Sequence, residues 1–200
     1  NIAEDLILEI GGNAMLVRAG ALHHDIGKIA FPMFFLENQN TGFNPHNEIS
    51  YEESAQVIIA HVTNGVKLAY KHSLPEPIID FIRTHHGTSK TKYFYNRYVA
   101  ENPDKPIDQT LFTYKGPRPF SRETAVVMMV DAVEAASRSL KTHSESEISK
   151  LVDNIINSQI ADEQFSNSDI TFKDVDKIKE LLKNKLQSIY HVRIEYEIKK

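Results

Sequence analysis

The feature that most constrains the fold of this chain is a helix-capping signal that occurs three times. In each case a serine or threonine is followed three residues later by an acidic residue and then by apolar residues at helical spacing. The two side chains of such a pair bond to backbone N–H groups of the first turn, which fixes where a helix begins. The three pairs are Ser50 with Glu53, Ser144 with Glu147, and Thr171 with Asp174.

Apolar periodicity, proline and glycine predict further helices around these three. They cover residues 3–10 and 13–24, a segment from Pro75 to His85, an aromatic segment around 93–98, and a strongly apolar segment from about 121 to 140. We expect the last of these to be the central buried helix. The predicted fold class is all-α, a bundle of roughly seven to nine helices. Only the tail, residues 191–200, alternates weakly and could form one edge strand.

Two segments rich in proline and asparagine, residues 26–49 and 102–120, are predicted to be long loops that contribute to a functional site. No internal repeat and no low-complexity linker divides the chain. We therefore expect residues 1–200 to form a single domain, with a core over about 1–140 and a C-terminal helical extension over about 141–200. Because the chain starts at Asn1 without a methionine, in what reads as the middle of a helix, we expect it to be cut from a longer protein.

Composition limits the chemistry that the chain can carry out. It contains no cysteine, so any metal must be held by histidine and carboxylate side chains. The net charge of -4 argues against wide binding of polymeric nucleic acid but allows a local basic pocket for a small anion. The longest apolar run, Ala125–Val130, is far shorter than the ~20 residues that span a bilayer, so we expect this part of the protein not to cross a membrane.

A histidine and an aspartate stand side by side at His24 and Asp25, just before Gly27. Adjacent residues within a helix point about 100° apart, so the pair could converge on a metal only near a helix end, which Gly27 and the preceding apolar run supply. Imidazole is a common metal ligand, and a carboxylate can bridge two ions. Taken alone, the dipeptide favours a plainer interpretation, in which Asp25 caps a helix and His24 is solvated.

The rest of the chain supplies partners for this pair. Asp131 interrupts the most apolar helix, where an unpaired carboxylate would be costly and a metal would satisfy it. Each residue of the set has a commoner explanation on its own, as a core histidine, a helix-end histidine or a capping aspartate. Together they form a candidate ligand set for two metal ions: His24, Asp25, His61, His85, His86 and Asp131. Glu134 and Arg138 share the helix face of Asp131 and could support the metal ligands or contact a phosphate.

The order of these residues resembles the HD superfamily of metal-dependent phosphohydrolases. Within it, the chain is similar to the cytoplasmic domain of seven-transmembrane HD receptors that hydrolyse cyclic di-AMP, and less similar to the HD-GYP branch because no Gly-Tyr-Pro triplet follows His85-His86. The segments that carry the resemblance are residues 20–28 with His24-Asp25-Ile26-Gly27-Lys28, Phe35-Leu36-Glu37-Asn38-Gln39, His85-His86-Gly87-Thr88, Gly116-Pro117-Arg118-Pro119 and residues 131–136.

The resemblance implies an all-helical fold and two transition-metal ions, iron or manganese. It assigns Asp25 as the bridging ligand, with His61, His85 and His86 on one ion and His24 and Asp131 on the other. The family has a further histidine on the helix before the His-Asp pair, and that position would precede Asn1. The ion held by His24 and Asp131 would therefore lack a ligand in this chain.

The resemblance also implies hydrolysis of a cyclic dinucleotide to the linear dinucleotide. The ligand set suits such a reaction, because two cations would lower the pKa of a bridging water and orient it for attack at phosphorus. We expect Asp25 and Lys28 to be the catalytic residues. Lys28 is also a candidate phosphate contact, although a lone lysine is commonly solvated surface. Lys115 and Arg118 could contact the second phosphate. Tyr93 and Tyr95 could stack on a base, or simply pack in the core.

Two alternatives stay open. The chain could be an HD phosphohydrolase that acts on mononucleotides or alarmones, or a degenerate module that binds a nucleotide and relays a signal without catalysis. The preference for cyclic di-AMP over cyclic di-GMP rests on the resemblance alone. The same resemblance implies a membrane-anchored parent protein, with this domain on the cytoplasmic side of the bacterial inner membrane.

Overall fold

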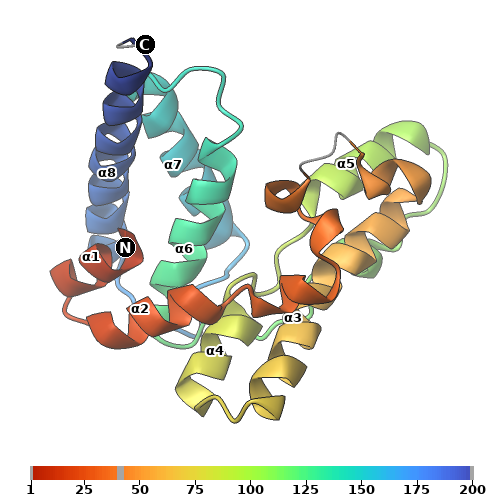
Figure 1. Cartoon of the computed structure of the whole chain (residues 1–200), viewed down its shortest axis with the longest axis horizontal. Coiled ribbons are helices and arrows are strands. Elements are labelled where there is room, and N and C mark those ends of the chain that lie inside the picture. Colours follow the sequence, from red (N-terminus) through yellow and green to blue (C-terminus); the bar gives the residue numbers. More distant parts are fainter. Residues whose placement is uncertain (1, 40–42, 199–200) are drawn as a thin grey trace. The chain divides into compact units, whose positions relative to one another are not determined.

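The computed structural model describes residues 2–39 and 43–198, and most of these lie in helices (Figure 1). Within this part of the chain there are eight α-helices and no strand, only one isolated bridge between Lys90 and Thr113. The predicted all-α class is confirmed. The helices are α1 (Ile2–Glu9), α2 (Ala14–His23), α3 (Tyr51–Lys71), α4 (Glu76–Thr84), α5 (Lys92–Glu101), α6 (Arg122–Ser137), α7 (Glu145–Ala161) and α8 (Phe172–Ile198).

The segment predicted as the first long loop is an ordered series of short 3-10 helices. They are η1 (Ile26–Ala30), η2 (Pro32–Phe34), η3 (Leu36–Asn38) and η4 (Pro45–Glu48), and a fifth, η5 (Gln109–Phe112), lies in the second predicted loop. Side chains hold the first series together: His46 bonds the carbonyl of Phe34 at 2.9 Å, and Gln39 donates to the carbonyl of Met33 at 3.2 Å. Residues 40–42 of this segment lie outside the described part.

The chain divides into two compact units, Leu22–Pro117 and a second unit made of Asn1–Ala21 with Arg118–Lys200. The prediction of one domain with a C-terminal extension stays a prediction. In the discontinuous unit, α6 packs on α1 and α7, and α8 packs on α7 and α1. The α6 residues Ala125–Met129 are all buried, which agrees with the predicted central helix. Ser121 begins α6 by accepting a hydrogen bond from the Thr124 N–H group.

The continuous unit, Leu22–Pro117, is built around α3. Its N-terminus has the predicted capping box, in which the Ser50 N–H donates to Glu53 at 2.9 Å and the Glu53 N–H donates to Ser50 at 3.1 Å. Helix α3 contacts η1, α4, α5 and η5. Apolar residues Ala69, Ile79 and Ile82 form the buried contact between α3 and α4.

Two glycines let η1 approach α3 more closely than any other residue would. A Cβ atom on Gly27 would lie 1.8 Å from the carbonyl oxygen of His61, and 2.5 Å from the backbone nitrogen of Gly65. Backbone atoms cannot move aside as a flexible side chain can, so only glycine fits at position 27. This contact places Asp25, two residues before Gly27, next to His61 on α3.

The predicted edge strand is wrong for residues 191–198, which continue α8 as a helix. A lone strand needs a partner to satisfy its backbone hydrogen bonds, and the described residues form no sheet, whereas a helix satisfies them within the segment. Residues 199–200 lie outside the described part. The remaining capping predictions agree with the structure, since Ser144 accepts from the Glu147 N–H group and Thr171 accepts from the Asp174 N–H group. Across the described ranges, no helix combines the length and the apolarity that crossing a bilayer requires.

Candidate metal centre

Two helices and one turn bring metal-ligating side chains together in the unit Leu22–Pro117. His61 projects from α3, His85 and His86 follow the last turn of α4, and His24 and Asp25 form the turn between α2 and η1. His85 is the C-cap residue of α4, and Gly87 after it has a φ of +50°, so the chain turns sharply there. As expected from the sequence, both adjacent pairs lie at helix ends, where neighbouring side chains can converge.

Five of the predicted ligands gather in one cluster. The Nε2 atoms of His61 and His85 are 3.0 Å apart, and Asp25 Oδ1 lies 3.4 Å from the first and 3.6 Å from the second. The other oxygen of Asp25 lies 3.3 Å from His24 Nε2. His86 completes a group of three histidines whose ligand atoms all lie within 4.8 Å of each other.

The backbone fixes which nitrogen of each central histidine faces the cluster. His61 Nδ1 lies 2.5 Å from the carbonyl oxygen of Ile58, and His85 Nδ1 lies 2.9 Å from that of Ile82. A carbonyl only accepts, so both Nδ1 atoms carry a proton, and in the neutral form of each ring Nε2 presents a lone pair. His61 and His85 are 2% and 1% exposed. Two buried lone pairs facing each other, with a carboxylate oxygen beside them, form a donor set that fits a cation.

Electrostatics set the protonation states of Asp25 and His85. Burial would raise the pKa of Asp25, but the hydrogen bond and charge of His24 and the charge of Lys28 outweigh it and hold the pKa well below its usual range. Burial also lowers the pKa of His85 well below the ordinary histidine value, and the neighbouring histidines act in the same direction. The carboxylate is therefore ionised and His85 is neutral near pH 7.

Lys28 lies directly beside the predicted bridging ligand. Its ammonium group is 2.7 Å from Asp25 Oδ2 and 2.7 Å from Glu37 Oε1. Burial opposes the charge on Lys28, but Asp25 and Glu37 outweigh this and raise its pKa. Glu37 belongs to one of the segments that carry the family resemblance, but the sequence predicts no role for it. Nothing in the local pattern indicated that Glu37 would fold back onto Lys28.

Tyr114 is a second residue that sequence reasoning missed. Its ring stacks on His86, with centroids 4.2 Å apart and planes 27° from parallel. Backbone hydrogen bonds from Tyr114 to Ser89 and from Thr91 to Phe112 hold this segment beside the end of α4. Tyr114 lies outside any helix, so helical spacing gave no signal for it.

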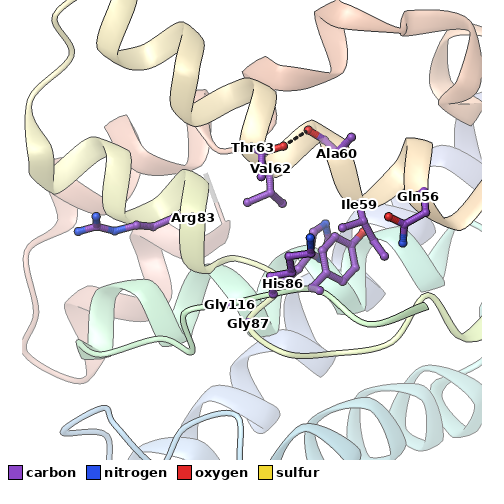
Figure 2. A pocket seen from close by; sticks show the side chains of 11 residues that line it. Gln56, Ile59, Ala60, Val62, Thr63, Arg83, His86, Gly87 and Gly116 are labelled. Atoms are coloured by element: carbon purple, nitrogen blue, oxygen red, sulfur yellow. Dashed lines mark hydrogen bonds between the residues drawn. The ribbon is translucent and has the colours of Figure 1, made fainter. Parts of the chain in front are cut away.

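His86 and Tyr114 line a pocket of about 130 Å³ (Figure 2). Its walls come from Ile59 and Thr63 on α3, from the end of α4, and from the segment that contains Lys115. In Figure 2 the Arg83 side chain extends away from the other labelled side chains. Lys115, predicted as a substrate contact, therefore lines a pocket that one candidate metal ligand also lines.

The other predicted site residues belong to the discontinuous unit. Asp131 is partly buried on α6, and its participation in the centre stays a prediction. Arg138 donates to both oxygens of Glu134, at 2.7 and 2.9 Å, so these two residues form an ion pair with each other. Arg118 contacts Glu163 at 3.5 Å and Ser166 at 3.2 Å. Their predicted roles in substrate binding are untested.

The two tyrosines considered for base stacking differ in their surroundings. Tyr95 packs edge-on against Phe112 with ring centroids 5.7 Å apart, and the Lys90 ammonium lies 5.0 Å from its ring. Tyr93 is 66% exposed and contacts Phe94. Packing therefore occupies Tyr95, as the plainer interpretation held, whereas the ring of Tyr93 is largely open to solvent.

Comparison with known proteins places the chain among relatives that share both its sequence and its fold. It is 39% identical over 196 residues to the cyclic-di-AMP phosphodiesterase PgpH of Listeria monocytogenes serotype 1/2a (strain 10403S) and 40% identical over 196 residues to that of Bacillus subtilis (strain 168). In both alignments 98% of this chain matches 27% of the relative, so the chain spans about a quarter of the length of these relatives. The crystal structure of the L. monocytogenes PgpH HD domain in complex with cyclic-di-AMP superposes with a TM-score of 0.91, at 38% identity, over 95% of this chain and 88% of that one.

The profile of one family covers the whole of the candidate ligand set. It is described as HD domain and matches residues 1–136, which include all six predicted ligands. The match implies binding of a divalent metal, and the cluster of His61, His85 and His86 offers ligands for one. By this match and by its close relatives, the chain belongs to the HD domain family.

Proposed function

We propose that this domain is a metal-dependent phosphodiesterase that hydrolyses cyclic di-AMP to the linear dinucleotide. The observation that carries the proposal is the meeting of two buried imidazole lone pairs with the ionised carboxylate of Asp25. Such a donor set has no evident structural purpose, because a packed core would favour apolar residues or paired donors and acceptors. The substrate is inferred from relatives named for cyclic di-AMP and from the related structure in complex with it.

The proposed metal ligands are those that the sequence indicated. His61, His85 and His86 would hold one ion, His24 and Asp131 the other, and Asp25 would bridge them. Bound cations would supply Lewis-acid activation of water and neutralise charge on the phosphodiester. Iron and manganese are the proposed ions, since histidine and carboxylate ligands suit both. Asp131 would join the set from α6.

The protein's own side chains would bind and orient the substrate. Lys28 lies next to Asp25 and carries a full positive charge, so it is well placed to contact the phosphate that is cleaved. Lys115 lines the pocket beside His86 and could contact a more distant phosphate. Arg118, Glu134 and Arg138 would contribute only if the ion pairs that they make within their own unit exchange for contacts with the nucleotide.

The wider setting is also a proposal. We infer that residues 1–200 act as one catalytic domain of a longer protein, anchored in the bacterial inner membrane with this domain on its cytoplasmic side. The proposed partner is the cyclic dinucleotide. Two observations support this inference. The chain spans about a quarter of the length of its PgpH relatives, and it resembles the seven-transmembrane HD receptors.

The experiment that tests the proposal compares two substrates and one variant. Protein loaded with manganese or iron is incubated with cyclic di-AMP or cyclic di-GMP, and the products are separated by chromatography. The expected result is linear di-AMP as the main product, with Asp25→Ala inactive at equal protein concentration. A longer form of the protein, extended to restore the upstream histidine of the family, serves as the positive control for the second metal site.

Two outcomes would contradict the proposal in different ways. If the extended protein yields no linear dinucleotide from either substrate, the chain is not this phosphodiesterase. If Asp25→Ala keeps full activity, the enzyme exists but the site is elsewhere. Rapid cleavage of a mononucleotide or alarmone with neither cyclic dinucleotide cleaved would favour the general nucleotide phosphohydrolase instead.

A further inference from the structure

The ammonium group of Lys28 is held from three sides. Asp25 Oδ2 and Glu37 Oε1 each lie 2.7 Å from Nζ, and the ring centroid of Phe35 lies 5.1 Å from it. Asp25 directly precedes η1, whereas Glu37 lies in η3. One carboxylate therefore comes before Lys28 in the sequence and the other comes after it. The chain between them folds back on itself through η2.

Among the residues that the structure describes, these contacts leave one donor of Lys28 available. An ammonium group has three N–H bonds and accepts nothing, so Asp25 and Glu37 engage two of them. The face of Phe35 offers only a cation–π contact, which stabilises the charge without using a specific N–H direction. With two donors fixed, the direction of the third is also fixed. It remains for an acceptor that arrives from outside the protein.

Glu37 matters because Asp25 alone would not fix this direction. A lysine side chain has four rotatable bonds and keeps much of its freedom when only one hydrogen bond anchors its end. The second carboxylate removes that freedom before the substrate binds, which is how preorganisation increases affinity. The carboxylate of Glu37 contacts Lys28, so we expect its effect on the site to pass through Lys28.

We propose that Glu37 is a positioning residue for phosphodiester hydrolysis: together with Asp25 it orients the Lys28 ammonium so that the remaining N–H meets a phosphate oxygen of the cyclic dinucleotide. This inference rests on the proposed function. Lys28 is the residue that touches the substrate, and Glu37 acts only by holding it.

A double-mutant cycle separates positioning from simple structural support. The variants are Glu37→Gln, Lys28→Met and the double variant, each loaded with manganese. Glu37→Asp tests whether a shorter carboxylate restores the contact. Glu48→Gln is the matched control, since it removes one negative charge from the neighbouring η4 without touching Lys28. Two quantities are measured for each protein: kcat/KM for cyclic di-AMP, and the affinity for a hydrolysis-resistant phosphorothioate analogue of it by calorimetry.

We expect the effects of the Glu37 and Lys28 substitutions on kcat/KM to be strongly coupled. Lys28→Met lowers kcat/KM about a hundredfold and Glu37→Gln about tenfold, in keeping with loss and misdirection of one charged hydrogen bond. In the Lys28→Met background, Glu37→Gln has no further effect, and the affinity for the analogue follows the same pattern. Glu37→Asp recovers part of the loss, and Glu48→Gln behaves as the unaltered protein.

Additive effects of Glu37→Gln and Lys28→Met, or a loss that tracks a lowered melting temperature in both Glu37 variants, would overturn the inference and leave Glu37 as a structural ion pair. Failure of the proposed function looks different. In that case the unaltered protein forms no linear dinucleotide. The affinity for the phosphorothioate analogue then decides between the two. If Glu37→Gln and Lys28→Met lower this affinity in a coupled way, the positioning role is supported. If neither substitution changes the affinity, or if the unaltered protein does not bind the analogue, the positioning role is ruled out.

Discussion

His61 and His85 face each other across 3.0 Å through their Nε2 atoms, while the backbone carbonyls of Ile58 and Ile82 accept hydrogen bonds from the opposite side of each ring. The two residues stand 24 positions apart in the chain and on different helices. Without a cation or a shared proton between them, the two lone pairs repel. The relationship therefore predicts how the protein responds to metal, to pH and to substitutions around the rings.

Bound metal should stabilise the folded state in addition to supporting catalysis. Binding to the native state alone adds about 2.7 kcal/mol to the free energy of unfolding when the free metal is at 100 times its Kd. We expect manganese to raise the melting temperature of the unaltered protein and a chelator to reverse the rise. His61→Ala should abolish most of this shift. A shift of equal size in His61→Ala would place the bound metal elsewhere.

The metal-free protein should lose stability as the pH falls below about 6.5, the ordinary value for histidine. His85 has a folded-state pKa well below that value, so between the two pKa values the unfolded chain binds a proton that the native state does not. Protonation of His85 in the unfolded chain therefore lowers the free energy of unfolding progressively as the pH falls from 6.5 toward the folded-state pKa. Above pH 6.5 it has no effect.

The measurement is chemical denaturation of chelated protein at several pH values between 7.5 and 5. His85→Asn should show a shallower fall in the free energy of unfolding over that range than the unaltered protein, because it lacks one titrating group. Asp25 does not account for such a difference, since its lowered pKa affects stability only as the pH falls below the ordinary aspartate value near 3.9. Identical slopes in the two proteins would mean that His85 is not held neutral.

Much of the fold follows from local signals, and the site follows from residue chemistry placed on that fold. Ser50 and Glu53 fixed the start of α3, and the glycine after His85-His86 fixed the end of α4, so the positions of three histidines could be predicted from nearby residues. The contacts of Glu37 and Tyr114 depend instead on how irregular segments fold back, which has no periodic signal. The prediction of an edge strand in the tail was wrong for a related reason. Weak alternation over 191–200 favours a strand only where a partner strand is present to pair with it.

Gly27 should tolerate no side chain. In Gly27→Ala the new Cβ would meet the backbone carbonyl of His61, whereas in Gly65→Ala it would meet chiefly the flexible side chain of Ile82 at 2.8 Å. We expect overpacking to cost about 1–3 kcal/mol, with Gly27→Ala at the upper end or beyond. Denaturation curves rank the two variants. Greater damage from Gly65→Ala would contradict the proposed packing of η1 on α3.

We expect the stacked ring of Tyr114 to hold His86 in place. Tyr114→Phe keeps the stacked ring and should bind metal as the unaltered protein does. Tyr114→Leu removes the ring and should weaken metal binding about tenfold, as loss of a group that orients a ligand does. Calorimetric titration with manganese compares the two. If both variants lose affinity equally, the hydroxyl group rather than the stack is responsible.

The central claim is that these side chains form a metal centre, and anomalous diffraction tests it most directly. Crystals of the protein grown with manganese and measured on both sides of the manganese absorption edge locate every bound ion. The account predicts a peak in direct contact with His61, His85, His86 and Asp25. A manganese-loaded crystal whose anomalous map is empty at this cluster, or whose peaks lie only at surface carboxylates, would contradict it.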